Sequence, residues 1–106
     1  RDRSVVQAYL DDPLIHDWAS AKLFIEATRA GEETLSQASA FDTPLLLICG
    51  QEDHLIDVSA CEEFFVNTSS EDKTLRVLPG LYHEVHNEPE KADVIEEIVQ
   101  WVNKRK

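Results

Sequence analysis

The stretch Thr-Pro-Leu-Leu-Leu-Ile-Cys-Gly-Gln-Glu-Asp, from Thr43 to Asp53, decides the fold of this 106-residue chain. Its apolar run Leu45–Cys49 is short and is stopped by Gly50, a pattern typical of a strand buried on both faces. A second run, Thr74–Leu78, is rich in residues that favour strands. A segment of helical length separates the two runs, and parallel neighbouring strands need such a crossover. The sequence therefore predicts a strand–helix–strand unit of the α/β class with a right-handed connection.

Two side chains suited to acid–base chemistry follow the predicted strands. Asp53 lies just past the first strand, and His83 lies just past the second. The loops that leave the carboxyl ends of parallel strands converge on one edge of the sheet, where sites form. A carboxylate held against a histidine ring nitrogen fixes the tautomer and stabilises the imidazolium, as a general base requires. The spacing therefore indicates an Asp53–His83 dyad.

Asp57 is the alternative acid. Asp57 or Ser59 can cap the helix that joins the two strands, and Ser59 and Glu62 have the spacing of a capping box. We prefer Asp53 because it lies in the turn immediately after the strand, whereas capping accounts for Asp57.

The turns around these residues resemble the C-terminal end of an α/β-hydrolase, and more narrowly the monoacylglycerol lipase and lysophospholipase group. Members of that group close with a Gly-x-x-Asp turn and a Tyr-His-Glu-like loop that leads to Asn-Glu. The corresponding segments here are Gly50–Asp53 and Tyr82–Glu88. The resemblance implies that Asp53 is the acid and His83 the base of a catalytic triad. The order of acid before histidine agrees with the hydrolase order.

The resemblance also implies a serine hydrolase that cleaves acylglycerols, lysophospholipids or related esters without a cofactor. The nucleophile elbow Gly-x-Ser-x-Gly does not occur here, since the only glycines are Gly31, Gly50 and Gly80. We therefore expect the serine and the oxyanion-hole loop upstream of Arg1. On this interpretation the chain is the C-terminal portion of a longer enzyme, inactive alone, and its partner is the missing N-terminal part of the same fold. The alternative is a non-catalytic binding or scaffold domain on the same frame.

Apolar residues at helical spacing predict helices before the first strand. A short helix ends at Asp12-Pro13, because the residue before proline avoids the helical region. A second helix is expected from about His16 to Arg29 with Gly31 as its stop signal, and a third from Glu32 to Ala40. By resemblance, residues 1–40 are the end of a lid and the return to the core.

Residues 41–106 are expected to form the strand–helix–strand–helix unit of the core. Glu88-Pro89 opens its last helix, since proline is favoured in the first turn. Within residues 1–40, an apolar stripe of Leu14, Trp18, Phe24 and Ile25 is most simply explained as core. The resemblance adds the hypothesis that this lid segment contacts a membrane transiently.

The composition excludes some classes of partner. A formal net charge of −11 argues against nucleic-acid binding, which rests on basic contacts to phosphate. The same charge argues against electrostatic attachment to anionic lipids. Cys49 and Cys61 are expected to be reduced thiols, which suits the cytosol. We expect a protein that is cytoplasmic or peripheral to a membrane.

A metal site is the remaining alternative for the histidine-rich loop. His83 and His86, three residues apart, together with His54, Asp53 or Glu84, are residue types that bind zinc. The two histidines precede the last helix rather than lying on it, and no cysteine or paired-histidine framework completes a set of ligands. We therefore predict no metal.

Overall fold

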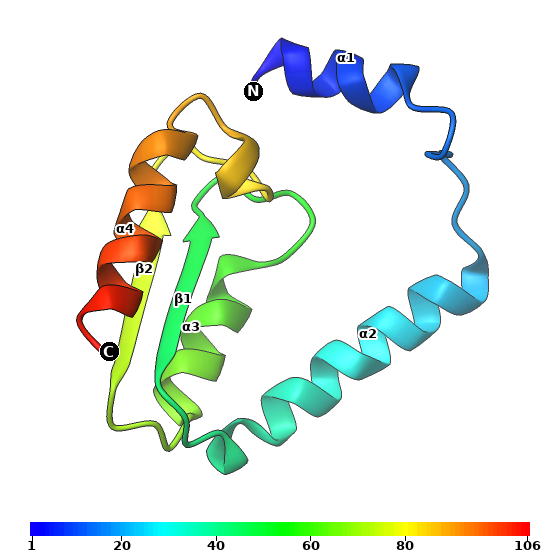
Figure 1. The fold of residues 1–106 in the computed structure, drawn as a ribbon. Helices are drawn as coiled ribbons and strands as arrows, with labels where there is room; N and C mark the ends of the chain where they lie inside the picture. The colour runs from blue at the N-terminus through cyan, green and yellow to red at the C-terminus, as the bar shows by residue number, and fades with distance from the viewer.

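Two parallel strands lie side by side at the centre of the computed structural model, which describes residues 1–106 (Figure 1). The strands are β1 (Leu45–Gly50) and β2 (Lys73–Leu78), and the helices are α1 (Arg3–Asp11), α2 (Ala21–Ser36), α3 (Val58–Asn67) and α4 (Lys91–Asn103). Two short 3-10 turns, η1 (Ala38–Ala40) and η2 (Val85–Asn87), precede β1 and α4. The predicted α/β class and the strand–helix–strand unit are confirmed.

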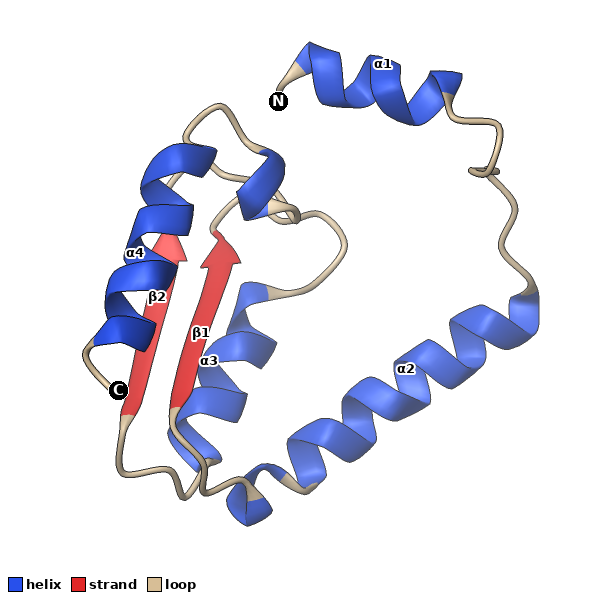
Figure 2. Ribbon diagram, in the orientation of Figure 1, coloured by secondary structure: helices blue, strands red, loops and turns tan.

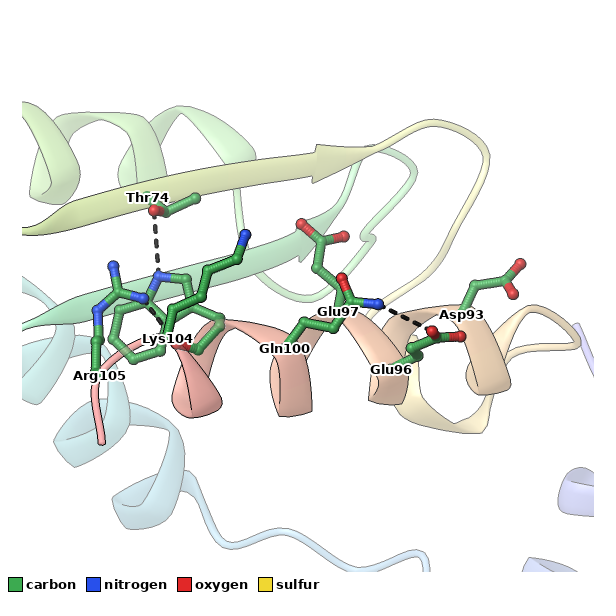
Figure 3. A pocket seen from close by; sticks show the side chains of 8 residues that line it. Thr74, Asp93, Glu96, Glu97, Gln100, Lys104 and Arg105 are labelled. Carbon is green, nitrogen blue, oxygen red and sulfur yellow. Dashed lines mark hydrogen bonds between the residues drawn. The ribbon is translucent and has the colours of Figure 1, made fainter.

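The two strands pair in one register along their whole length, from Leu45 opposite Lys73 to Gly50 opposite Leu78. Helix α3 connects them and packs against both strands. Helix α4 lies along β2, where the indole nitrogen of Trp101 donates a hydrogen bond to the Thr74 hydroxyl at 3.2 Å (Figure 3). Because Gly50 and Leu78 are paired at the end of this register, both strands end at the same edge of the sheet.

Side chains cap both ends of α3, the helix that connects the two strands. The Asp57 carboxylate accepts a hydrogen bond from the Ser59 amide at the start of α3, so the predicted capping role of Asp57 is confirmed. At the other end, the Lys73 ammonium donates to the carbonyls of Phe65 and Thr68, each at 2.8 Å. A cation at a helix C-terminus satisfies free carbonyls and complements the helix dipole. The first residue of β2 is thus tied to the end of α3.

The predicted bounds of the second helix are wrong. Helix α2 begins at Ala21 because the Ser20 hydroxyl caps it, accepting a hydrogen bond from the Leu23 amide at 3.0 Å. The helix then continues through Gly31 to Ser36, so the predicted third helix is its last part followed by η1. One glycine inside a helix costs only about 1 kcal/mol relative to alanine, and the residues after Gly31 sustain the helix.

Few side chains are buried. Only eight of 106 residues are buried, and Ala38, Cys49, Leu81 and Val94 are the apolar ones among them. The expectation of a strand buried on both faces is wrong for the first part of β1, because Leu45–Ile48 are only half-buried. Cys49 and Cys61 are free thiols in the structure. Burial, and next the Cys61 thiol, raise the pKa of Cys49 to about 12, so Cys49 packs as a protonated core residue.

The N-terminal helices extend away from the strands (Figure 2). The radius of gyration is 15.8 Å, against about 13 Å for a compact domain of this length. In the segment that joins α1 to α2, the side chains of Leu14 and Trp18 are 89% and 83% exposed, so the interpretation of this stripe as core is wrong within residues 1–106. No helix is both long enough and apolar enough to span a membrane.

We expect residues 1–106 produced alone to be marginally stable or to aggregate, because so much apolar surface is uncovered. The measurements are size-exclusion chromatography, binding of a hydrophobic dye, and urea denaturation. A monomer with a cooperative unfolding transition and no dye binding would contradict this expectation.

Candidate active site

The loops that follow β1 and β2 are joined through their backbones. The Gln51 amide donates a hydrogen bond to the Leu78 carbonyl, and the Glu52 amide donates to the Leu81 carbonyl, both at 2.9 Å. These two bonds continue the pairing of the strands beyond the sheet. The turn that carries Asp53 and the loop that carries His83 are therefore held together before any side chain contributes.

Gly50 permits this close approach. A Cβ atom at position 50 would lie 2.2 Å from the carbonyl oxygen of Tyr82 and 2.3 Å from that of Leu81. Both oxygens belong to the backbone of the histidine loop, so a side chain at position 50 would push this loop away from β1. The glycine that stopped the apolar run in the sequence thus has a packing role at the site.

Asp53 makes three hydrogen bonds through its two carboxylate oxygens. Its Oδ1 accepts from the amides of Leu55 at 2.8 Å and Ile56 at 3.0 Å. Its Oδ2 lies 2.8 Å from Nδ1 of His83, and the Asp53 side chain is only 5% exposed. The predicted contact between Asp53 and His83 is therefore confirmed, while their catalytic roles remain predictions.

These contacts determine the ionisation of Asp53. Burial pushes its pKa upward, but the hydrogen bonds from the His83 ring and then from the Ile56 and Leu55 amides outweigh burial. The net effect is a pKa below the ordinary aspartate value. Asp53 is thus a carboxylate at neutral pH and can only accept hydrogen bonds.

The ionised state of Asp53 selects the tautomer of His83. Because the carboxylate accepts, Nδ1 must carry the proton, and the lone pair of a neutral ring then lies on Nε2. The His83 side chain is 45% exposed, and Asp53 is its only hydrogen-bond partner. This is the arrangement of a general base: one ring nitrogen is held by an acid and the other is free to take a proton.

The residues after His83 support its loop. The side-chain amide of Asn87 donates a hydrogen bond to the Glu84 carboxylate at 2.8 Å, within the loop. The buried carboxylate of Glu88 accepts from the Tyr82 amide at 2.7 Å, immediately before His83. One participant was missed: Arg1 also contacts this loop, and no local pattern in the sequence signals a contact across nearly the whole chain.

The rival residues lie elsewhere. Asp57 caps α3 and does not contact His83. His86 is exposed, and His54 is exposed beside the ring of Tyr82 at a centroid distance of 5.4 Å. No three histidine, cysteine, aspartate or glutamate side chains are grouped as metal ligands.

An open apolar pocket adjoins the acid turn. Its volume is about 740 Å³, and it lies between α2, α3 and the segment after Asp53. Leu55 and Ile56, whose amides bind Asp53, are among the residues that line it, and Phe24 and Phe64 line it from the two helices. The segment that lines this pocket therefore also donates the backbone hydrogen bonds that hold the Asp53 carboxylate.

The fold is shared with a known family. Residues 1–90 match the family described as "Serine aminopeptidase, S33", which consists of α/β-hydrolases, and the chain belongs to it. The structure corresponds to a C-terminal portion of this fold that resembles monoacylglycerol lipases, as predicted.

Individual relatives define the likeness further. The chain is 40% identical to the monoacylglycerol lipase of Mycolicibacterium smegmatis, over 96% of this chain and 37% of that protein. It is 32% identical to the monoglyceride lipase of Homo sapiens, over 99% of this chain and 36% of that protein. The crystal structure of Paleococcus ferrophilus monoacylglycerol lipase superposes with a TM-score of 0.91 at 28% identity, over 100% of this chain and 42% of that one. The chain thus spans little more than a third of the length of these two curated lipases.

Substitution of Gly50 tests the close approach of the two loops. In the full-length protein that contains this chain, we expect Gly50→Ala to lower the free energy of unfolding by about 1–3 kcal/mol or more, because the new methyl group would meet backbone atoms. Gly31→Ala is the matched control. Nothing lies within 4 Å of its Cβ position, and alanine inside α2 should stabilise by about 0.5–1 kcal/mol. Urea denaturation measures both, and equal effects of the two substitutions would contradict the analysis.

The lowered pKa of Asp53 predicts a dependence of stability on pH. As the pH falls, the unfolded state takes up this proton before the folded state does, so ionised Asp53 stabilises the fold only at higher pH. We expect the free energy of unfolding of the full-length protein to fall below about pH 4, the ordinary aspartate range. The decline should be shallower for Asp53→Asn and unchanged for Asp42→Asn, which alters an exposed aspartate. Urea titrations across this range would refute the prediction if the Asp53→Asn and wild-type curves run parallel.

Proposed function

We propose that the protein containing this chain is a serine hydrolase that cleaves carboxylic esters, with Asp53 and His83 as the acid and base of its triad. The observation that carries the proposal is the 2.8 Å contact between Asp53 Oδ2 and His83 Nδ1. This contact lies at the carboxyl ends of two parallel strands, where sites form in open α/β sheets. The family match and the lipase relatives support the same class of reaction.

The roles follow from the direction of the hydrogen bonds. His83 Nε2 takes the proton of the attacking serine hydroxyl while that oxygen bonds to the ester carbonyl carbon. The imidazolium then returns the proton to the leaving alcohol, and a water molecule repeats the sequence to release the acid. Asp53 keeps the proton on Nδ1 and stabilises the charged ring. Its own pKa is lowered, so it remains an acceptor throughout.

The nucleophile belongs to residues outside this sequence, since Gly-x-Ser-x-Gly does not occur in it. The first partner of this chain is then the remainder of the same fold. Two features favour such a partner: β1 pairs with β2 only, so its other edge is unpaired, and many large apolar side chains are exposed. Residues 1–106 alone should have no esterase activity.

Acylglycerols and lysophospholipids are the proposed substrates. Relatives at 32–40% identity bear the names monoacylglycerol lipase and monoglyceride lipase. The apolar pocket beside the Asp53 turn suits an acyl chain better than a polar substrate. Residues 1–40 serve as the end of a lid, and the exposed Leu14 and Trp18 give that segment an apolar surface for transient contact with a membrane. The protein is accordingly cytoplasmic or peripheral to a membrane.

The decisive experiment compares substitutions in the full-length protein. We expect His83→Ala and Asp53→Asn each to lower kcat on a short-chain acyl ester by about three to four orders of magnitude, with folding retained. Turnover, circular dichroism and labelling by a serine-directed fluorophosphonate are measured together. Near-normal turnover by either variant would refute the assignment of roles, and a wild-type protein that neither hydrolyses esters nor reacts with the probe would point to a scaffold.

Two matched controls use the rejected candidates. His86→Ala removes an exposed histidine three residues after His83, and Asp57→Asn removes the rival acid while keeping a side chain that caps α3 well. Both variants should retain turnover close to that of the wild type. A loss of activity in Asp57→Asn comparable to that of Asp53→Asn would reverse the assignment of the acid.

A further inference from the structure

The start of the chain contacts both ends of the loop that carries His83. The guanidinium of Arg1 donates one hydrogen bond to the Gly80 carbonyl at 3.0 Å and another to the Glu90 carboxylate at 2.7 Å. Gly80 precedes His83 and Glu90 follows it. Gly80 has φ of +74°, so the loop begins at a backbone conformation that glycine adopts readily. A single planar side chain thus bridges the two ends of the histidine loop.

Glu88 forms the inner part of the same arrangement. Its side chain is only 3% exposed. One carboxylate oxygen, Oε1, accepts a hydrogen bond from the Tyr82 amide at 2.7 Å. The other, Oε2, has no hydrogen-bond partner, and the backbone nitrogen of Arg1 lies 3.5 Å from it. A buried carboxylate is costly unless donors surround it, so the hydrogen bond from the Tyr82 amide stabilises this position of the Glu88 side chain.

The first turn of α1 adds a third connection. Asp2 caps this helix through the Ser4 amide and also lies 3.8 Å from the Lys91 ammonium at the start of α4. Helix α1 itself makes few other contacts with the rest of the fold. Within residues 1–106, the main contacts of this part of the chain are therefore those of Arg1 and Asp2 with the histidine loop and the start of α4.

We propose that Arg1 and Glu88 act as a clamp that sets the position of the histidine loop, which makes both of them positioning residues for His83. The proposal rests on the function proposed above, in that the position of His83 matters for turnover. The proposal extends that function because it links Arg1, which precedes α1, and Glu88 to the geometry of the Asp53–His83 hydrogen bond.

The loop needs such a clamp for a physical reason. Its regular structure is limited to the short turn η2, and His83 is held by one side-chain hydrogen bond. A displacement of His83 by a fraction of an ångström lengthens that bond and misplaces Nε2 relative to the serine, and catalysis is sensitive to such shifts. Arg1 holds the loop from outside, through Gly80 and Glu90, and Glu88 holds it from inside, through Tyr82.

The test uses full-length protein with Arg1→Ala, Glu88→Ala and Glu88→Gln. We expect the two alanine variants to lower kcat on a short-chain ester at least tenfold with KM nearly unchanged, because the clamp acts on the position of the base. Glu88→Gln should recover part of kcat, since its carbonyl oxygen can still accept from the Tyr82 amide. Arg3→Ala and Glu63→Ala remove exposed charges that have no partner in the structure, and both should match the wild type.

A second readout does not depend on activity. The proton between Asp53 and His83 should give a far-downfield resonance in proton NMR of the wild type. We expect this resonance to broaden or vanish in both alanine variants and to persist in the two controls. Variants that lose only thermal stability, with the kcat of the folded fraction and the resonance unchanged, would overturn the proposal. If Glu88→Ala does not fold, Arg1→Ala decides the outcome, because Arg1 is partly exposed. If the wild type hydrolyses no ester, the proposed function fails, and the resonance alone then decides on the clamp.

Discussion

The parallel pairing of β1 with β2 is the constraint on which the rest of this structure depends. The register runs from Leu45 opposite Lys73 to Gly50 opposite Leu78, so the two strands end together. Backbone hydrogen bonds then join the loops that follow, and Gly50 leaves room for the second loop to cross close to the first. The contact between Asp53 and His83 is a consequence of this backbone arrangement. A slip of one residue in register would separate the side chains of Asp53 and His83. It would also move every side chain of the slipped strand to the opposite face of the sheet.

The candidate site combines a well-held aspartate with a more accessible histidine. Asp53 is buried, and amides of its own turn satisfy one of its oxygens, so only the other oxygen is available to orient His83. The ring of His83 is nearly half exposed and is located by its loop as much as by Asp53. Burial of the acid strengthens its hydrogen bonds by excluding water, and exposure of the ring leaves Nε2 accessible. This division suits the proposed role of His83, in which the ring transfers a proton to and from groups outside this chain.

Much of the core could be predicted from the sequence because its signals are local. The apolar run before Gly50, the spacing to the second strand and the turn that contains Asp53 each lie within a few residues. The pairing of Asp53 with His83 followed from the rule that parallel strands end at one edge. The N-terminal helices were predicted less well: Ser20 provides a stronger start signal than the apolar spacing from His16, and Gly31 lies inside α2 and does not end it. The contact of Arg1 with Gly80 depends on the path of the whole chain, and no short pattern encodes it.

The two tryptophans report on the two halves of this structure separately. The indole of Trp101 lies between the Arg105 guanidinium, whose central carbon is 3.4 Å from the ring centroid, and the Thr74 hydroxyl. Trp18 lies in the connection between α1 and α2 and is almost fully exposed. Because indole emission shifts to longer wavelength in water, Trp18 should emit like a free indole until another surface covers that connection. Intrinsic fluorescence can therefore distinguish covering of the N-terminal segment from folding of the sheet, without any added label.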